Sequence, residues 1–286
     1  MVECYTPKSL DEALAIRRRT GARPLAGGTD LMVQYKQGVG ITPVFPFPVM
    51  IISGIEELKG IETCEDGSVL IKALTTPSQI ASCEAVPYLV RAAAGRMGAV
   101  ALRNSATIGG NVGNASPKGD LPQPLILLDA TVILRSQDGE RELLLDDFIL
   151  GSKKTDLHDD EIIYAVRIPK VEYSYIYYRK IGTRRANAIS KLSLSALALV
   201  QDGRIIDFRA SSGAAGPKVI RSHEAEALVV GQRLDDIQAI LPGFLAAWDA
   251  AISPHAMPQY RRNTTRRMLE HFLTTVATAP QEGVIE

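Results

Sequence analysis

The strongest constraint on the fold of this chain comes from two glycine-rich segments, residues 24–31 (PLAGGTDL) and 106–111 (ATIGGN). Glycine can adopt positive φ angles and lacks a Cβ, so a turn built on it can direct several backbone N–H groups at one anion. A hydroxyl donor, Thr29 or Thr107, lies close to each Gly-Gly pair. Either segment alone is equally typical of an ordinary turn between strands. Together they favour a dinucleotide whose phosphates are held between two lobes.

Length and charge limit what the rest of the chain can be. The 286 residues suffice for two domains, and 46% of them are hydrophobic, which supplies a large core. The 32 basic and 32 acidic side chains balance, so no net charge draws the chain to nucleic acid or to an acidic membrane. The start lacks a basic-then-apolar leader, and no apolar run reaches the roughly 18 residues that span a bilayer. We therefore expect a soluble cytoplasmic protein with no integral membrane segment and no nucleic-acid partner.

Cysteine and histidine are too scattered to predict a metal site. The three cysteines and four histidines are Cys4, Cys64, Cys83, His158, His223, His255 and His271. We expect no metal ligand and no iron–sulfur cluster in this chain, so any such centre must belong to another polypeptide. The serine elbow of hydrolases, the P-loop and the Rossmann fingerprint are also missing. No pair of side chains indicates acid–base chemistry, and we assign no catalytic residue.

Helices and strands alternate in the first 170 residues. Ser9 to Glu12 form a capping box at the start of a short helix. Leu31 begins another helix, which the proline-rich residues 42–48 end. Helices are also predicted from Thr76 and over 88–97, with a turn at 103–105. The predicted strands are 24–26, 49–52, 69–74, 125–134 and 161–168.

After Pro169 the pattern changes to strands followed by helices. The predicted strands are 175–180, 192–200 and 204–210, and the predicted helices are 222–230, 234–250 and 258–276. This order predicts a small sheet covered by helices, with a domain boundary near 171–174. The tail from Ala279 is expected to be frayed.

An ordered series of motifs resembles the FAD-binding medium subunit of the molybdenum hydroxylases, the family of carbon monoxide dehydrogenase and xanthine dehydrogenase. The motifs are 26–30 (AGGTD), 102–111 (LRNSATIGGN), 115–117 (ASP) with Asp120, 128–130 (LDA), 160–163 (DEII) to 168–169 (IP), 180–184 (KIGTR) and 260–261 (YR). No single motif decides the matter, but their order and spacing extend the resemblance over almost the whole chain.

The resemblance implies an α+β fold with two domains. Residues 1–172 would form a two-lobed FAD-binding domain of the vanillyl-alcohol-oxidase (PCMH) type, with subdomains of about 1–55 and 56–172. A small α+β domain would follow at 173–280. The cofactor-binding residues that the resemblance implies are Pro24, Leu25, Ala26, Gly27, Gly28, Thr29, Asp30, Leu31, Met97, Thr107, Ile108, Gly109, Gly110, Asn111, Asp120, Ile163 and Lys180.

Three of these residues also have ordinary explanations. Lys180 suits a position near the flavin ring, because a cation there would stabilise the anionic reduced ring, but it could be a surface lysine on a strand. Asp120 could equally be a turn residue and Ile163 simple core. Met97 stands where some relatives have an aromatic cofactor contact. The backbone N–H groups of both glycine segments are expected to hold the pyrophosphate.

The family resemblance implies an electron-transfer subunit. FAD in this chain would take electrons from [2Fe–2S] clusters of a small partner subunit, which receives them from a molybdenum cofactor of the molybdopterin type in a large one. It would then pass them to an external acceptor. The chain lacks the cysteine-bearing insertion of relatives that hold a [4Fe–4S] cluster. It also has Ile51-Ile52-Ser53-Gly54 where many relatives have Asp-Ile. Two alternatives stay open: a stand-alone FAD-dependent oxidoreductase, and a binding module that has lost flavin.

Overall fold

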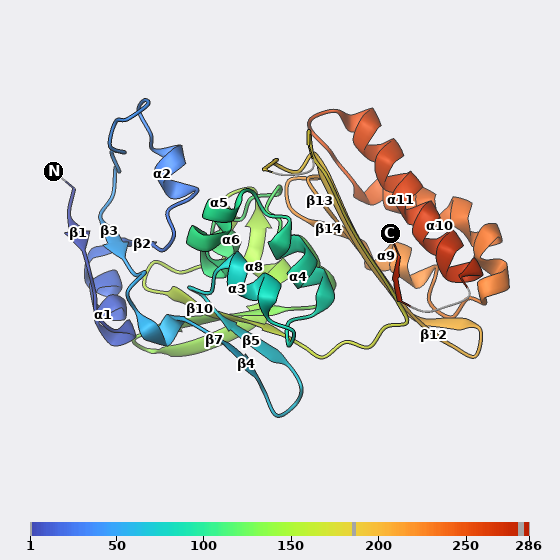
Figure 1. Cartoon of the computed structure of the whole chain (residues 1–286), viewed down its shortest axis with the longest axis horizontal. Helices are drawn as coiled ribbons and strands as arrows, with labels where there is room; N and C mark the ends of the chain where they lie inside the picture. The colour runs from blue at the N-terminus through green and yellow to red at the C-terminus, as the bar shows by residue number, and fades with distance from the viewer. Residues whose placement is uncertain (1, 185–186, 280–282, 286) are drawn as a thin grey trace.

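The structure, a computed structural model, describes residues 2–184, 187–279 and 283–285. The chain forms three units in a row: an N-terminal lobe, a middle lobe and a C-terminal domain (Figure 1). Each unit is built on its own sheet, and a two-stranded sheet of β8 (Ile149–Gly151) and β9 (Lys154–Thr155) accompanies the middle one. The predicted α+β class with a small C-terminal domain is confirmed.

The N-terminal lobe is a small parallel sheet packed against one helix. Its strands, in spatial order, are β1 (Cys4–Tyr5), β3 (Val49–Ile51) and β2 (Arg23–Leu25). The helix α1 (Leu10–Thr20) begins where predicted, because the Ser9 hydroxyl accepts from the Glu12 N–H at 3.2 Å. A short helix, α2 (Leu31–Gln34), follows the first glycine segment.

The middle lobe is an antiparallel sheet covered by short helices. Its strands, in spatial order, are β4 (Ile61–Thr63), β5 (Val69–Lys72), β10 (Ile162–Ile168), β6 (Thr131–Ser136) and β7 (Gly139–Leu144). The helical turns are η1 (Glu56–Leu58), α3 (Pro77–Ser82), α4 (Tyr88–Gly95), α5 (Val100–Ser105), α6 (Ile108–Gly113), α7 (Pro122–Leu127) and α8 (Leu145–Phe148). Leucine, isoleucine and valine side chains from both layers form its core.

The C-terminal domain is a five-stranded sheet with helices on one face (Figure 1). Its strands, in spatial order, are β14 (Ile220–Arg221), β13 (Arg204–Gly213), β12 (Leu192–Gln201), β11 (Tyr175–Ile181) and β15 (Gly283–Ile285). The helices are α9 (His223–Ala227), η2 (Leu234–Asp236), α10 (Ile237–Ala251) and α11 (Pro258–Thr278). Phe208, Phe244, Trp248 and Phe272 are fully buried between them.

The opposite face of this sheet packs on the middle lobe, chiefly on α7. Ile176 and Tyr178 of β11 belong to the same buried cluster as the middle-lobe core. Gln123 of α7 is fully buried and spans the interface, because its Nε2 donates to Ser211 Oγ at 2.7 Å and its Oε1 accepts from Ser195 Oγ at 3.0 Å. Buried polar groups that find all their partners across an interface fix the relative position of its two sides.

Several local predictions were wrong. The helix that begins at Leu31 ends at Gln34, well before the proline-rich residues 42–48 that were expected to end it. Residues 125–134 do not form one strand: α7 occupies Pro122–Leu127, and the strand begins only at Thr131. A run that is apolar throughout has no periodicity to separate a buried helix from a buried strand. The predicted turn at 103–105 is the last turn of α5. The tail contains β15, which pairs in parallel with β11 and so is not frayed over Gly283–Ile285.

Candidate cofactor site

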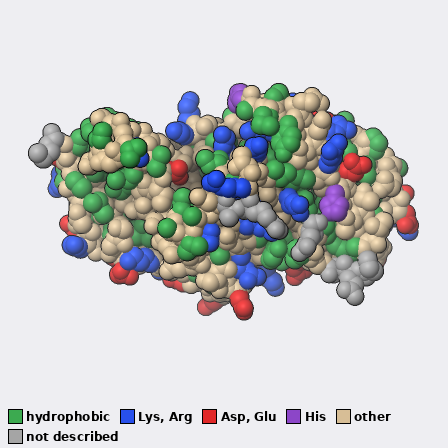
Figure 2. All heavy atoms as spheres, turned by 45° about the horizontal axis from the view of Figure 1, so that its top comes forward, with side chains coloured by type: hydrophobic (Ala, Val, Ile, Leu, Met, Phe, Trp, Pro, Cys, Tyr) green, Lys and Arg blue, Asp and Glu red, His purple; other side chains and the backbone are tan. Residues whose placement is uncertain are grey.

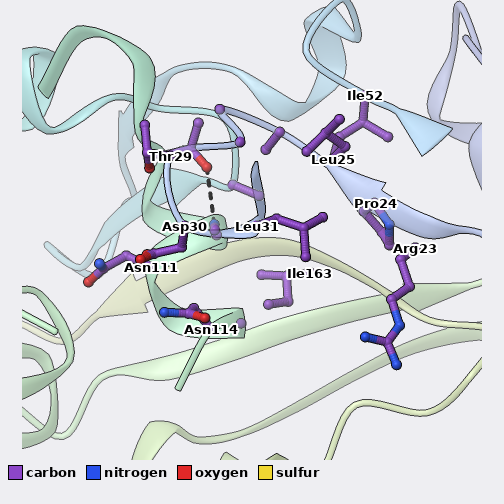
Figure 3. A pocket seen from close by; sticks show the side chains of 18 of the residues that line it. Arg23, Pro24, Leu25, Thr29, Asp30, Leu31, Ile52, Asn111, Asn114 and Ile163 are labelled. Carbon is purple, nitrogen blue, oxygen red and sulfur yellow. Dashed lines mark hydrogen bonds between the residues drawn. The ribbon is translucent and has the colours of Figure 1, made fainter. Parts of the chain in front are cut away.

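A cavity of about 510 Å³ lies between the N-terminal and middle lobes, and both glycine segments line it (Figure 3). It brings together most of the predicted cofactor-binding residues. Those that line it are Pro24, Leu25, Ala26, Gly27, Gly28, Thr29, Asp30, Leu31, Met97, Thr107, Gly109, Gly110, Asn111 and Ile163. Ile108, Asp120 and Lys180 do not line it.

Gly27 allows the two lobes to approach each other, and Gly109 allows helix α6 to pack closely on the chain after β5 within the middle lobe. A Cβ on Gly27 would lie 1.8 Å from the Ser105 carbonyl oxygen and 3.0 Å from the Ala106 Cα. Gly109 is equally confined, since a Cβ there would lie 2.7 Å from the Cβ of Ala73 and 2.9 Å from its carbonyl oxygen. Backbone meets backbone at both points, so no side-chain rotation could make room. The site therefore depends on glycine for packing as well as for chain flexibility.

The first glycine segment offers backbone donors to the cavity. The N–H groups of Gly27, Gly28 and Thr29 have no acceptor within residues 2–184, 187–279 and 283–285. Gly28 has φ +68°, a conformation that favours glycine and turns the chain toward α2. Successive free N–H groups in such a turn form a concave site for an anion. The segment therefore offers a set of backbone donors that a phosphate or diphosphate group could accept from.

The second glycine segment differs from the prediction. Four of its N–H groups are already used inside the chain: Ile108 donates to Thr75 O at 3.0 Å, Gly109 to Ala73 O at 2.9 Å, Gly110 to Thr107 Oγ1 at 3.0 Å and Asn111 to Thr107 O at 2.9 Å. The Thr107 N–H has no acceptor in the described part of the chain. The segment is the start of helix α6, capped by the Thr107 hydroxyl. The four N–H groups are therefore not free donors for a pyrophosphate.

The second segment presents two groups to the cavity: the exposed backbone of Gly110 and the amide side chain of Asn111. Gly110 is exposed and has no Cβ. The Asn111 Oδ1 accepts from the Leu121 N–H at 3.3 Å, which leaves its NH₂ group as a donor. Asn111 lies beside Asp30 on one side of the cavity in Figure 3. Ile108 is completely buried in the middle-lobe core, so its side chain supports the segment from behind.

Asp120 and Lys180 form an ion pair behind the Met97 end of the cavity. Lys180 Nζ lies 2.7 Å from Asp120 Oδ2, and the two side chains are 7% and 10% exposed. Ser190 Oγ donates to the other carboxylate oxygen at 2.8 Å, and Lys180 Nζ also donates to the carbonyl of Arg96, the residue before Met97, at 3.0 Å. Burial raises the pKa of Asp120, and the Lys180 charge and the Ser190 hydrogen bond oppose that rise.

Several residues that line the cavity belong to no motif, so the sequence did not predict them as part of a site. Arg17 of α1 is buried, and its guanidinium donates to the carbonyls of Glu161, Gly21 and Ala22 at 3.1 to 3.2 Å. Burial lowers the pKa of Arg17. These bonds tie α1 to the start of β10 and to the strand that leads into the first glycine segment. The other lining residues that the sequence analysis missed include Arg23, Gln34, Asn114, Lys153 and Asp159.

A hydrogen bond between two cavity-lining side chains joins the N-terminal lobe to the middle lobe. Gln34 Nε2 of α2 donates to Asn114 Oδ1 at 2.9 Å. Gln34 directly precedes Tyr35, which also lines the cavity. This bond helps to hold α2 over the glycine segments. No local pattern could have indicated it, because the two residues are 80 positions apart.

Charge on the surface is less even than the balanced totals indicate. On the face shown in Figure 2, Lys and Arg side chains spread over the middle, and Asp and Glu side chains lie mostly along the margins. A zero net charge therefore does not exclude a locally positive face. No helix in the described part of the chain combines the length and the apolar character that crossing a bilayer requires.

Comparison with known families identifies the family of the chain. Residues 1–171 match the family described as "FAD binding domain in molybdopterin dehydrogenase". Residues 177–276 match "CO dehydrogenase flavoprotein C-terminal domain". The chain belongs to the FAD-binding medium subunits of the molybdenum hydroxylases. The matched domain makes FAD the cofactor of this medium subunit, and the free N–H groups of the first glycine segment fit its diphosphate.

Individual relatives agree with this assignment. The medium subunit is 32% identical over 233 residues to the glyceraldehyde dehydrogenase medium chain of Sulfolobus acidocaldarius, covering 80% of this chain and 81% of the relative. It is 31% identical over 255 residues to the nicotinate dehydrogenase FAD-subunit of Eubacterium barkeri, covering 84% of each. A chain of carbon monoxide dehydrogenase from Hydrogenophaga pseudoflava superposes with a TM-score of 0.86 at 25% identity, covering 95% of this chain and 96% of that one. The medium subunit is therefore a component of an oxidoreductase.

Proposed function

We propose that this medium subunit binds FAD between its lobes and passes electrons from [2Fe–2S] clusters of a small partner subunit to an external acceptor. The substrate would be oxidised at the molybdenum cofactor of a large partner subunit. The cavity lined by both glycine segments carries this proposal, because it combines free backbone donors with the sequence of an FAD-binding family. Relatives named as medium chains and FAD-subunits of dehydrogenases support this assignment of FAD and substrate oxidation to different subunits.

The residues of this chain would have separate tasks. The N–H groups of Gly27, Gly28 and Thr29 would hold the diphosphate, and the Asn111 amide would donate from the facing lobe. Met97 is 93% buried where it lines the cavity, so it would give the ring system an apolar contact. FAD, when bound, supplies a redox centre that connects one-electron iron–sulfur donors to one- or two-electron acceptors.

The Lys180–Asp120 ion pair lies outside the cavity lining, next to Met97, and would influence the cofactor indirectly. Because the pair lies next to Met97 and is largely screened from water, its orientation influences the field at that end of the cavity. We infer that Lys180 positions the Arg96–Met97 backbone through its hydrogen bond to the Arg96 carbonyl. Asp120 and Lys180 would thus affect the cofactor through positioning and their electric field, and not from the cavity wall.

Titration with FAD tests the binding step. The purified full chain should quench the fluorescence of added FAD at a ratio of one to one and keep the flavin absorption bands after gel filtration. If FAD is bound neither by the isolated chain nor by the chain co-expressed with its partner subunits, the proposal is wrong.

Electron transfer needs a second experiment. Co-purification with a large molybdenum subunit and a small iron–sulfur subunit is expected, and substrate of that complex should bleach the flavin absorption. Removing the small subunit should prevent bleaching. Bleaching by a substrate of the isolated chain would instead indicate a stand-alone oxidoreductase. Reoxidation of the complex with NAD⁺, a quinone, a cytochrome or oxygen, each in turn, would identify the acceptor.

A further inference from the structure

Three exposed lysines without a counter-ion lie on two loops beside the cofactor cavity. Lys153 and Lys154 belong to the β8–β9 hairpin, and Lys118 belongs to the loop that follows helix α6. None of the three forms an ion pair with a carboxylate in the described part of the chain. Lys153 also lines the cavity. Unpaired cations on neighbouring loops create a positive potential that attracts anionic groups.

The two loops are joined to each other and to the C-terminal domain. The Lys153 N–H donates to the Ala115 carbonyl at 3.0 Å. The Pro117 carbonyl, one residue before Lys118, accepts from the Ala214 N–H of the C-terminal domain at 2.7 Å. Ala115 and Lys153 have φ angles of 43° and 59°, so the bond between them links two left-handed turns. These bonds hold the backbone under the lysines in a fixed arrangement.

Acidic residues of the neighbouring segments do not neutralise the three lysines. The Asp146 carboxylate lies 2.8 Å from the Nζ of another lysine, Lys218, and the Asp156 carboxylate lies 2.8 Å from the Arg141 guanidinium. Two more carboxylates, of Asp30 and Asp147, are exposed and have no ion pair among the described residues. The three free lysines outnumber these two carboxylates, so the surface keeps a positive excess.

The Lys118 loop also connects this surface with the Met97 end of the cavity. Asp120, two residues after Lys118, is buried and pairs with Lys180 at 2.7 Å. The Lys180 ammonium donates in turn to the carbonyl of the residue before Met97, at 3.0 Å. One short loop therefore has an exposed cation at Lys118 and a buried contact to the Met97 end at Asp120. A partner that binds the lysines would lie close to the end of the cavity where we place the ring system.

Resting on the electron transfer proposed above, we propose that Lys118, Lys153 and Lys154 dock an acidic one-electron carrier protein as the external acceptor. Lys118 and Lys154 extend from exposed loops and do not line the cavity, which suits the surface of a protein better than a small anion. Each carrier takes one electron, so the two electrons of reduced FAD reduce two carriers in turn, and its two protons pass to water. Complementary charge raises the rate at which such carriers associate.

Two carriers of opposite charge test the docking. The full chain is loaded with FAD, reduced photochemically without oxygen, and mixed with plastocyanin, an acidic carrier, or with cytochrome c, a basic one. At about 0.01 M salt, the double variant Lys118→Glu with Lys154→Glu should reduce plastocyanin about tenfold more slowly and cytochrome c no more slowly than the unaltered chain. The control is Lys8→Glu with Lys170→Glu, because both of these lysines are exposed, lie on other loops and have no ion pair in the described chain.

Binding without electron transfer gives an independent measurement. Plastocyanin that is already reduced should shift the amide NMR signals of residues 117–119 and 152–154 in the isotopically labelled full chain. Signals that do not move in these loops would overturn the inference. Equal slowing of both carriers by the double variant, or equal slowing of plastocyanin by the control, would overturn it too. A chain that binds no FAD would contradict the proposed function instead, and the amide measurement would still test the docking.

Discussion

Gly27, where the two lobes meet backbone to backbone, gives the sharpest test of the site. Changing Gly27 to Ala adds one methyl group 1.8 Å from the Ser105 carbonyl oxygen, where ordinary contact needs 3.4 Å or more. The lobes would have to separate by about 1.6 Å at this point, because backbone atoms on both sides prevent a smaller adjustment. Overpacking of this kind costs about 3 kcal/mol or more. We expect the free energy of unfolding to fall by about that amount and Kd for FAD to rise at least about tenfold.

Alanine substitutions at two other glycines distinguish the effect of crowding at Gly27 from the other effects of changing glycine to alanine. Gly54→Ala adds a methyl group with no neighbour within 4 Å at an ordinary φ, so stability should change by less than about 0.5 kcal/mol. Gly28→Ala places alanine at φ +68° against the flexible Met32 side chain, which should cost about 1–2 kcal/mol. Urea denaturation and FAD titration of the three variants give the comparison. If Gly27→Ala matches Gly54→Ala in both measurements, the lobes do not meet as described.

Two further predictions concern buried charges. Asp120→Asn leaves the buried Lys180 ammonium without its counter-ion, so urea denaturation should show a loss of about 3–5 kcal/mol, and a loss below about 1 kcal/mol would contradict the pairing. Burial alone would raise the pKa of Glu161, but Arg141 and the His158 N–H outweigh it and hold that pKa below 4.5. Its contribution to stability is therefore present above pH 4.5 and lost as the pH falls through the lowered pKa. Denaturation of Glu161→Gln from about pH 3 to 6 should show a shallower acid loss than the unaltered chain, and parallel curves would refute this.

Much of the fold could be predicted because its signals are local. The Ser9 hydroxyl that accepts from Glu12 marks the start of α1 in the sequence as in the structure. The β6–β7 hairpin turns at Gln137–Asp138, and Gly139 follows directly, an Asp-Gly pair that is typical of such turns. In each case the residues that form the feature are within a few positions of each other, so propensity and spacing are sufficient.

Two parts of the predicted site could not be judged from the sequence, because their bonding depends on distant partners. The sequence of residues 107–111 indicates free N–H donors, but Thr75 and Ala73 accept two of them. Asp120 and Lys180 fit positions next to a cofactor, yet their burial between the middle lobe and the C-terminal domain pairs them with each other. A carbonyl or a counter-ion brought in from another part of the chain competes with any ligand.

The sequence by itself determined the family, the cofactor class and the two glycine segments that line the site, since these reside in residue types at fixed local spacing. Only the tertiary structure decided that Gly27 touches Ser105, that Gln34 reaches Asn114 and that Arg23 stands on Phe47 at the end of the cavity. The reason is physical: a contact between lobes depends on how sheets and helices pack, and packing is a property of the whole folded chain.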